Sequence, residues 1–110
     1  MSYRVIYSGV WRQRVERLLI AAQSASLVHP IKTALVQLHE IMEHDPVGSG
    51  EPLYRLKHAG LMVYIVVRRY VSVNFAVDED RNLVYVMKFS FSGNHPYPPE
   101  FEEILNPKKS

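Results

Sequence analysis

The hydrophobic period of this chain changes once, across a stretch rich in proline and glycine at residues 46–52, and this change constrains the fold more than any other feature. Between residues 31 and 42, apolar side chains recur at the spacing of one helical face. Between residues 71 and 77, apolar side chains alternate with a period of two, which is typical of a strand with one buried face. The sequence therefore predicts helices before residue 46 and strands after residue 52.

Local signals give the approximate bounds of the expected elements. A short strand at 3–7 is followed by a helix over about 11–25, with Ser8 as its cap. A second helix starts near Pro30, because proline suits the first helical turn, and it ends at Asp45–Pro46. Residues 47–52 are predicted to be a loop. The expected later strands are 53–57, 61–67, 71–77 and 83–89, with a turn at 78–82.

These elements predict an α+β fold of order β-α-α-β-β-β(β). The short connections between the later strands make them antiparallel neighbours, so we expect a twisted, mainly antiparallel sheet with both helices packed on one face. The other face is expected to carry Ser72, Asn74, Lys88 and Ser90. The predicted core consists of Trp11, Val15, Leu18, Leu35, Leu38, Met42, Val73, Phe75 and Tyr85.

Length and composition favour one domain. We expect residues 1–92 to form the α+β domain and residues 93–110 to form a proline-rich C-terminal tail, with one helical turn near 100–105. The chain has no cysteine, which excludes disulfides and thiolate metal sites. The longest apolar run, 61–67, is far shorter than the ~20 residues that a membrane-spanning helix needs. A cytoplasmic location is the resulting expectation, with no role at a membrane.

Positive charge is unevenly distributed. The segment 52–77 contains no acidic residue, although the net charge of the chain is only +2. Basic side chains interleaved with tyrosines can contact phosphates and stack on bases. The candidate nucleic-acid contacts are Arg55, Lys57, Arg68, Arg69 and Lys88, and the interleaved aromatic residues are Tyr54, Tyr64 and Tyr70. The alternative is a solvated sheet edge whose charges prevent aggregation and whose tyrosines pack as ordinary strand residues.

Several phrases in the second half resemble the RelE/ParE superfamily of toxin–antitoxin and plasmid-stabilisation toxins. Residues 53–57 (LYRLK) are similar to the Arg-Leu-Lys phrase before the central hairpin of these proteins. Residues 70–75 (YVSVNF), the acidic 78–80 (DED) and 83–86 (LVYV) are similar to the hairpin strands and turn that follow. The resemblance covers about residues 3–92. It implies a toxin-like protein that acts on mRNA at the ribosome or binds a cellular target, with an antitoxin protein as its partner.

The basic strand of the ribonuclease members can be aligned with this chain in two registers. In the first, Arg55 and Lys57 match the two cations of that strand. In the second, 61–68 is the strand, the cation positions fall on Tyr64 and Val66, and Val71 stands where an arginine is expected. Under either register the last strand ends without an arginine. The resemblance therefore implies an incomplete catalytic constellation.

Whether the chain is an enzyme stays open at this point. His95 and Tyr97 follow the last strand, as a terminal His–Tyr pair does in some family members, and they are the catalytic candidates. The alternative function is a non-catalytic protein-interaction module on the same scaffold, without toxicity.

The histidines of the second helix do not form a metalloprotease motif. His39 and His44 are five positions apart, about 140° around a helix, whereas that motif needs a spacing of four. We expect a solvated helix end in which Glu40 and His44 pair at i, i+4. No metal and no cofactor are predicted.

Overall fold

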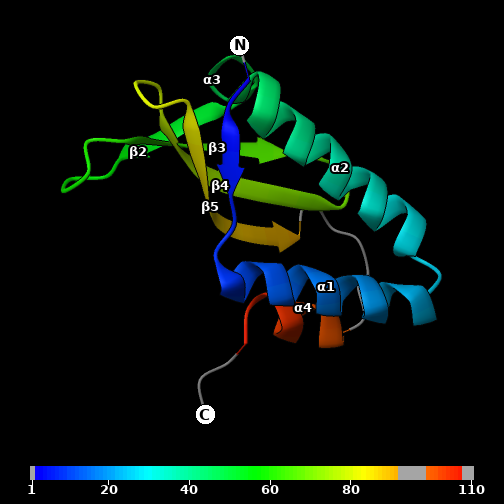
Figure 1. The fold of residues 1–110 in the computed structure, drawn as a ribbon. Helices are drawn as coiled ribbons and strands as arrows, with labels where there is room; N and C mark the ends of the chain where they lie inside the picture. Colours follow the sequence, from blue (N-terminus) through cyan, green and yellow to red (C-terminus); the bar gives the residue numbers. More distant parts are fainter. Residues whose placement is uncertain (1, 92–98, 108–110) are drawn as a thin grey trace.

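The structure, a computed structural model, describes residues 2–91 and 99–107 (Figure 1). The elements are β1 (Arg4–Ile6), α1 (Gly9–Ser24), α2 (Val28–His44), α3 (Pro46–Ser49), β2 (Glu51–Arg55), β3 (Met62–Val67), β4 (Val71–Asp78), β5 (Leu83–Phe91) and α4 (Pro99–Leu105). The α+β class is confirmed. Each long helix and strand predicted from the hydrophobic period is present, and bounds differ by a few residues.

The two long helices form a hairpin with a tight connection. Ser8 caps α1 as predicted, because its Oγ accepts a hydrogen bond from the backbone N–H of Trp11. At the other end, Ser26 has a φ of 58°, and the N–H of Leu27 donates to the carbonyl of Ala22. This is the Schellman arrangement, in which a left-handed residue satisfies the last carbonyls of a helix. The chain therefore reverses within three residues and lays α2 beside α1.

The five strands form one mixed sheet in the order β1-β5-β4-β3-β2. All neighbours are antiparallel except β1, which runs parallel to β5. Figure 1 shows both long helices on the same side of the sheet. The core between them includes Leu18, Leu38, Met42, Val73 and Phe75, which are all fully buried as predicted. Trp11, Val15 and Leu35 are partly buried and pack against this core.

The prediction that Tyr85 belongs to the core is wrong, because β5 contains a β-bulge. Asn74 pairs with Lys88 but Phe75 pairs with Val86, so Met87 is an extra residue. The bulge changes which residues face the helices, and strict alternation through the strand fails. Tyr85 consequently pairs with Ala76 on the face away from the helices.

A short helix replaces the predicted loop after α2. Pro46 is the first residue of α3 and is fully buried. Gly50 then starts the path into β2, and a Cβ at this position would lie 2.7 Å from the Pro46 carbonyl oxygen and 3.0 Å from Cβ of Tyr64. Glycine is needed here because the backbone passes so close to the sheet.

The helical turn expected near residues 100–105 is α4, and it packs against α1. Its Phe101 and Leu105 are buried in the core, and Phe101 stacks on Phe91 at a centroid distance of 6.1 Å. This part of the C-terminal segment therefore contributes to the core of the domain.

The outer edge of the sheet is β2, in which every residue is exposed. Pro52 has no N–H to donate, and the register shifts between Pro52 and Tyr54. Proline and an irregular register both prevent an exposed edge from pairing with another strand. The β2 edge is therefore poorly suited to pair with a strand of another molecule.

Candidate functional site

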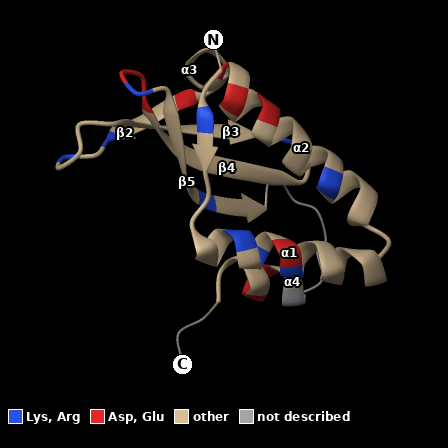
Figure 2. Ribbon diagram, viewed as in Figure 1, with Lys and Arg blue, Asp and Glu red and all other residues tan. Residues whose placement is uncertain are grey.

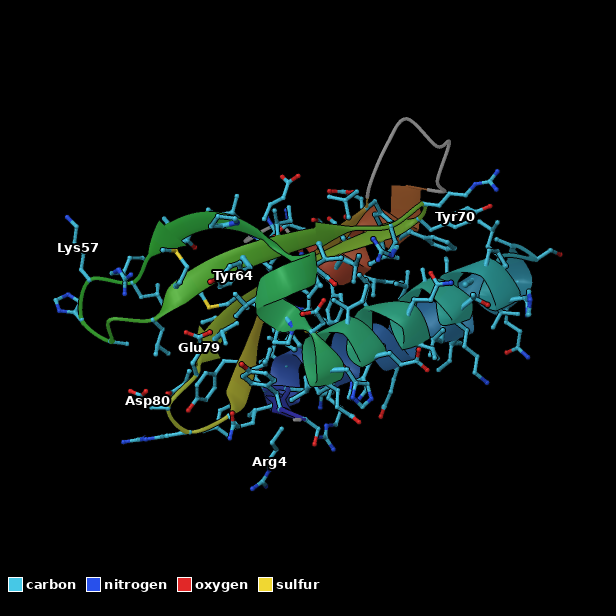
Figure 3. All side chains as sticks on the ribbon, turned by 90° about the horizontal axis from the view of Figure 1, so that it is seen from above. Arg4, Lys57, Tyr64, Tyr70, Glu79 and Asp80 are labelled. Carbon is cyan, nitrogen blue, oxygen red and sulfur yellow. The ribbon has the colours of Figure 1, made fainter. Side chains whose placement is uncertain are left out.

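The five predicted cations do not form one cluster. Arg55 ends β2 and Lys57 follows it in the β2–β3 loop, whereas Arg68 and Arg69 lie in the turn between β3 and β4. The six residues of β3 separate these two groups by roughly 20 Å. Figure 3 shows Lys57 and Tyr70, the neighbour of Arg69, at opposite ends of the molecule. Lys88 lies between them along the sheet, on β5.

Two of these cations lie on the side of the sheet that carries the helices. Arg55 pairs with Met62, which shares a face with the core residues of β3, and its Nη1 donates to the carbonyl of Gly60 at 2.8 Å. Arg68 is half-buried and lines a hollow with Glu40 and Asp45 beside α2. Both side chains therefore lie away from the face of the sheet without helices, because the pleat turns their positions toward the helices.

The face without helices has the polar residues that were predicted for it. Asn74 pairs with Lys88, and Ser72 pairs with Ser90. Ser72 is buried, and its Oγ lies 2.9 Å from Oγ of Ser90 and 3.3 Å from the Ser90 carbonyl oxygen. Since the two serines satisfy each other, the exposed Lys88 is the charged group that this strip offers to a ligand.

The basic loop and the acidic turn lie at the same end of the sheet (Figure 2). Arg55 and Tyr64 line a hollow of about 220 Å³ together with residues 78–80 of the β4–β5 turn. The acidic side chains reduce the positive potential around Arg55, which makes it a poor phosphate contact. Lys57 does not line this hollow, and it points outward from the loop.

The three candidate tyrosines differ in environment. Tyr64 stacks on Phe75, with ring centroids 6.0 Å apart, so it packs as an ordinary strand residue. The Arg69 guanidinium lies over the ring of Tyr70 at 5.5 Å. Tyr54 is half exposed at the sheet edge. The catalytic candidates His95 and Tyr97 lie outside the described residues.

A chain of hydrogen bonds that sequence reasoning missed connects β1 to α2. The hydroxyl of Tyr7 lies 2.7 Å from Nδ1 of His39, and Nε2 of His39 lies 3.2 Å from Oε2 of Glu43. The other oxygen of Glu43 lies 3.3 Å from Nε2 of His44. The predicted pairing of Glu40 with His44 is therefore wrong, because Glu43 lies between the two histidines.

The protonation state of Tyr7 determines which groups donate and which accept in these hydrogen bonds. Burial raises the pKa of Tyr7 from 10.0 to about 12, and the positive charge of Arg12 opposes the rise. The phenol therefore stays protonated at neutral pH and donates to Nδ1 when the imidazole of His39 is neutral. The ring proton is then on Nε2, where it points to Glu43. A phenol in this state is a hydrogen-bond donor and a poor nucleophile.

Two hollows flank this chain and meet between the long helices. One, of about 420 Å³, is lined by Tyr7, Arg12, Glu16 and Phe89, and the other, of about 530 Å³, includes His39 and Glu43. Val15 and Leu35 line both, so they form one groove along α1 and α2. Within residues 2–91 and 99–107, no three histidines or carboxylates are placed to hold a metal ion.

The i, i+4 spacing of His39 and Glu43 is the one signal in the sequence that could have revealed the hydrogen-bonded chain. Tyr7 gives no such signal, because it lies 32 positions from His39 and reaches it only through the fold.

Comparison of the chain with protein-family models, with curated proteins and with solved structures gives no match. In the described part of the chain, none of the helices has the length and apolar character needed to span a membrane.

Proposed function

We propose that this chain is a toxin-like protein of the RelE/ParE type that acts by binding RNA, free or on the ribosome, without cutting it. The order of elements supports this proposal: one strand, two long helices and then consecutive antiparallel strands. This is the order that the resemblance of residues 53–57 and 70–86 implies. The open face of the sheet is the proposed contact surface.

The spread of the cations is the observation that favours binding over cleavage. Cleavage needs several cationic groups around one phosphate, because the charge that develops there must be stabilised locally. Exposed Lys57, Lys88 and Arg69 lie instead at one end, in the middle and at the other end of the sheet. Cations separated in this way can each contact a different phosphate of a single strand.

A second candidate function, a protein-interaction module without toxicity, is favoured by a different observation. Tyr54 and Val67 are each about half exposed, at 50% and 55%, on the edge strand β2 and on its neighbour β3. Both lie on the open face by register, since Tyr54 pairs with Val63 and Val67 pairs with Ser72. Exposed aromatic and aliphatic side chains of this kind are typical anchors for a protein partner.

Titration of the purified chain against single-stranded RNA at several salt concentrations tests the RNA-binding proposal. The variant Arg69→Gln with Lys88→Gln removes two proposed contacts, and Arg12→Gln with Arg17→Gln removes the same charge from the exposed side of α1. We expect the first variant to lower the salt slope by roughly 1.4, since each single-strand contact contributes about 0.7. The control should keep the wild-type slope.

Three outcomes would reject this proposal. RNA fragments that accumulate with the wild-type protein would mean cleavage. Equal slopes for the two variants would mean unspecific charge attraction. If the wild-type protein does not bind RNA at low salt, and cells that express it grow normally, the protein-interaction module would be favoured.

A further inference from the structure

The solvent-facing side of α2 has a charge pattern that is complementary to itself. Lys32, Val36 and Glu40 follow one another at i, i+4 and i+8, so they form a single ridge along the helix. All three are exposed, and Val36 exposes 49% of its surface. The ridge therefore runs from a positive charge through an apolar centre to a negative charge.

The two charged residues of this ridge make no ion pair within the described part of the chain. Neither Lys32 nor Glu40 makes an ion pair there, whereas the nearby Glu43 contacts both His39 and His44. Lys32 and Glu40 each lie about 6 Å along the axis from Val36, because a helix rises 1.5 Å per residue. The apolar centre thus has opposite charges at equal distances on its two sides.

We propose that the chain forms a two-fold symmetric homodimer through α2. An axis through Val36 places the two helices antiparallel, with Val36 against Val36 of the second copy. Lys32 of each copy then faces Glu40 of the other, which makes two equivalent ion pairs. A symmetric interface requires a surface that complements itself, and the order of these three residues meets that requirement.

Apolar surface beside the ridge extends the proposed contact. Val36 also lines the 530 Å³ hollow, together with the apolar Val15, Leu19 and Leu35. Ile20 of α1 is 68% exposed, and it lies one turn after Glu16, which lines the adjoining hollow. The two helices of the second copy can therefore cover the groove as well as the ridge. This dimer does not depend on the proposed RNA binding.

Sedimentation equilibrium over a range of protein concentrations tests the dimer, with a charge exchange as its central comparison. Lys32→Glu and Glu40→Lys each place like charges at both ends of the contact, so each should weaken association about tenfold. The double variant Lys32→Glu with Glu40→Lys restores opposite charges at both ends and should return to the wild-type dissociation constant. All these positions are exposed, and circular dichroism should show unchanged folding.

The apolar centre is tested by Val36→Glu, which should be monomeric at every concentration at which the wild type is a dimer. Val67→Glu is the matched control, because Val67 is similarly exposed but lies on the sheet, and it should stay dimeric. A monomeric wild type, a dimeric Val36→Glu, or a charge-exchanged double variant no tighter than the single variants would each overturn the proposal.

Discussion

The hydroxyl of Tyr7 and Nδ1 of His39 lie 2.7 Å apart and join the end of the first strand to the middle of the second helix. The backbone repeats this connection, since the N–H of Tyr3 donates to the carbonyl of Glu43 at 2.6 Å. β1 is thus attached to α2 on one side and paired with β5 on the other. Tyr7 is also stacked on Phe89, so its ring and its hydroxyl both contribute to positioning the strand.

Replacing Tyr7 with phenylalanine should lower the free energy of unfolding by about 1 kcal/mol, because one hydrogen bond is lost while the ring stays in place. Urea denaturation measures this change. Tyr54→Phe is the control, since Tyr54 is half exposed with no hydrogen bond to its hydroxyl within the described residues, and it should change stability by less than ~0.5 kcal/mol. Equal stability of the two variants would mean that the bond contributes nothing.

Stability should also depend on Tyr7 at alkaline pH. Its folded pKa of about 12 lies above the unfolded value of 10.0, so its contribution is fully present below pH 10. Between the two values the unfolded phenol loses its proton and the folded one keeps it, which favours unfolding. The free energy of unfolding should therefore fall, by up to ~1.4 kcal/mol per pH unit from this group.

Phenylalanine does not ionise, so comparison with Tyr7→Phe isolates this effect from the other groups that titrate at alkaline pH. The stability advantage of the wild type over the variant should shrink as the pH rises from 10 toward 12. Two stability curves that stay parallel across this range would contradict the assignment.

The close packing of Gly50 gives a paired test of the fold. Gly50→Ala should destabilise the protein by about 1–3 kcal/mol, because its Cβ would lie 2.7 Å from the Pro46 carbonyl oxygen. Gly9→Ala is the matched change, since nothing lies within 4 Å of a Cβ there, and it should be neutral or stabilise by up to ~1 kcal/mol. Thermal unfolding of both variants checks the difference in sign.

The contribution of α4 to the core can be measured with Phe101→Ala. Phe101 is fully buried, and its truncation should cost about 3–5 kcal/mol. Glu102→Ala, one position further and exposed, should cost less than ~0.5 kcal/mol. If both changes were equally mild, α4 would be dispensable for the stability of the domain.

The helices, the strands and the packing of both long helices on one face of the sheet could be predicted from the sequence, because all of these depend on local periodicity. The apolar stripe from Ile31 to Met42 and the alternation from Val71 to Val77 each specify one buried face. The parallel pairing of β1 with β5 was not predictable in this way. It joins residues about 80 positions apart, and no local pattern encodes which strand a short N-terminal segment will pair with.

The site was harder to predict because residues close in sequence lie in different environments, whereas residues far apart in sequence are in contact. Arg55 and Lys57 are two positions apart, yet one is turned toward the acidic β4–β5 turn and the other points outward from the loop. Tyr7 and His39 are distant in sequence and share a hydrogen bond. Strand pleat, turn position and helix packing decide these relations, and only the first can be read from a period of two.

The extra residue at Met87 gives β5 two segments in opposite phase, and this bears on how the sequence can tolerate a deletion. Loss of a residue within a strand normally exchanges its inner and outer side chains along the whole remainder. Loss of Met87 would instead remove the bulge. Val86 would then adjoin Lys88, and strict alternation from Leu83 would keep Lys88 and Ser90 on the open face and Phe89 and Phe91 toward the helices. The strand can therefore lose residue 87 without exchanging its inner and outer side chains.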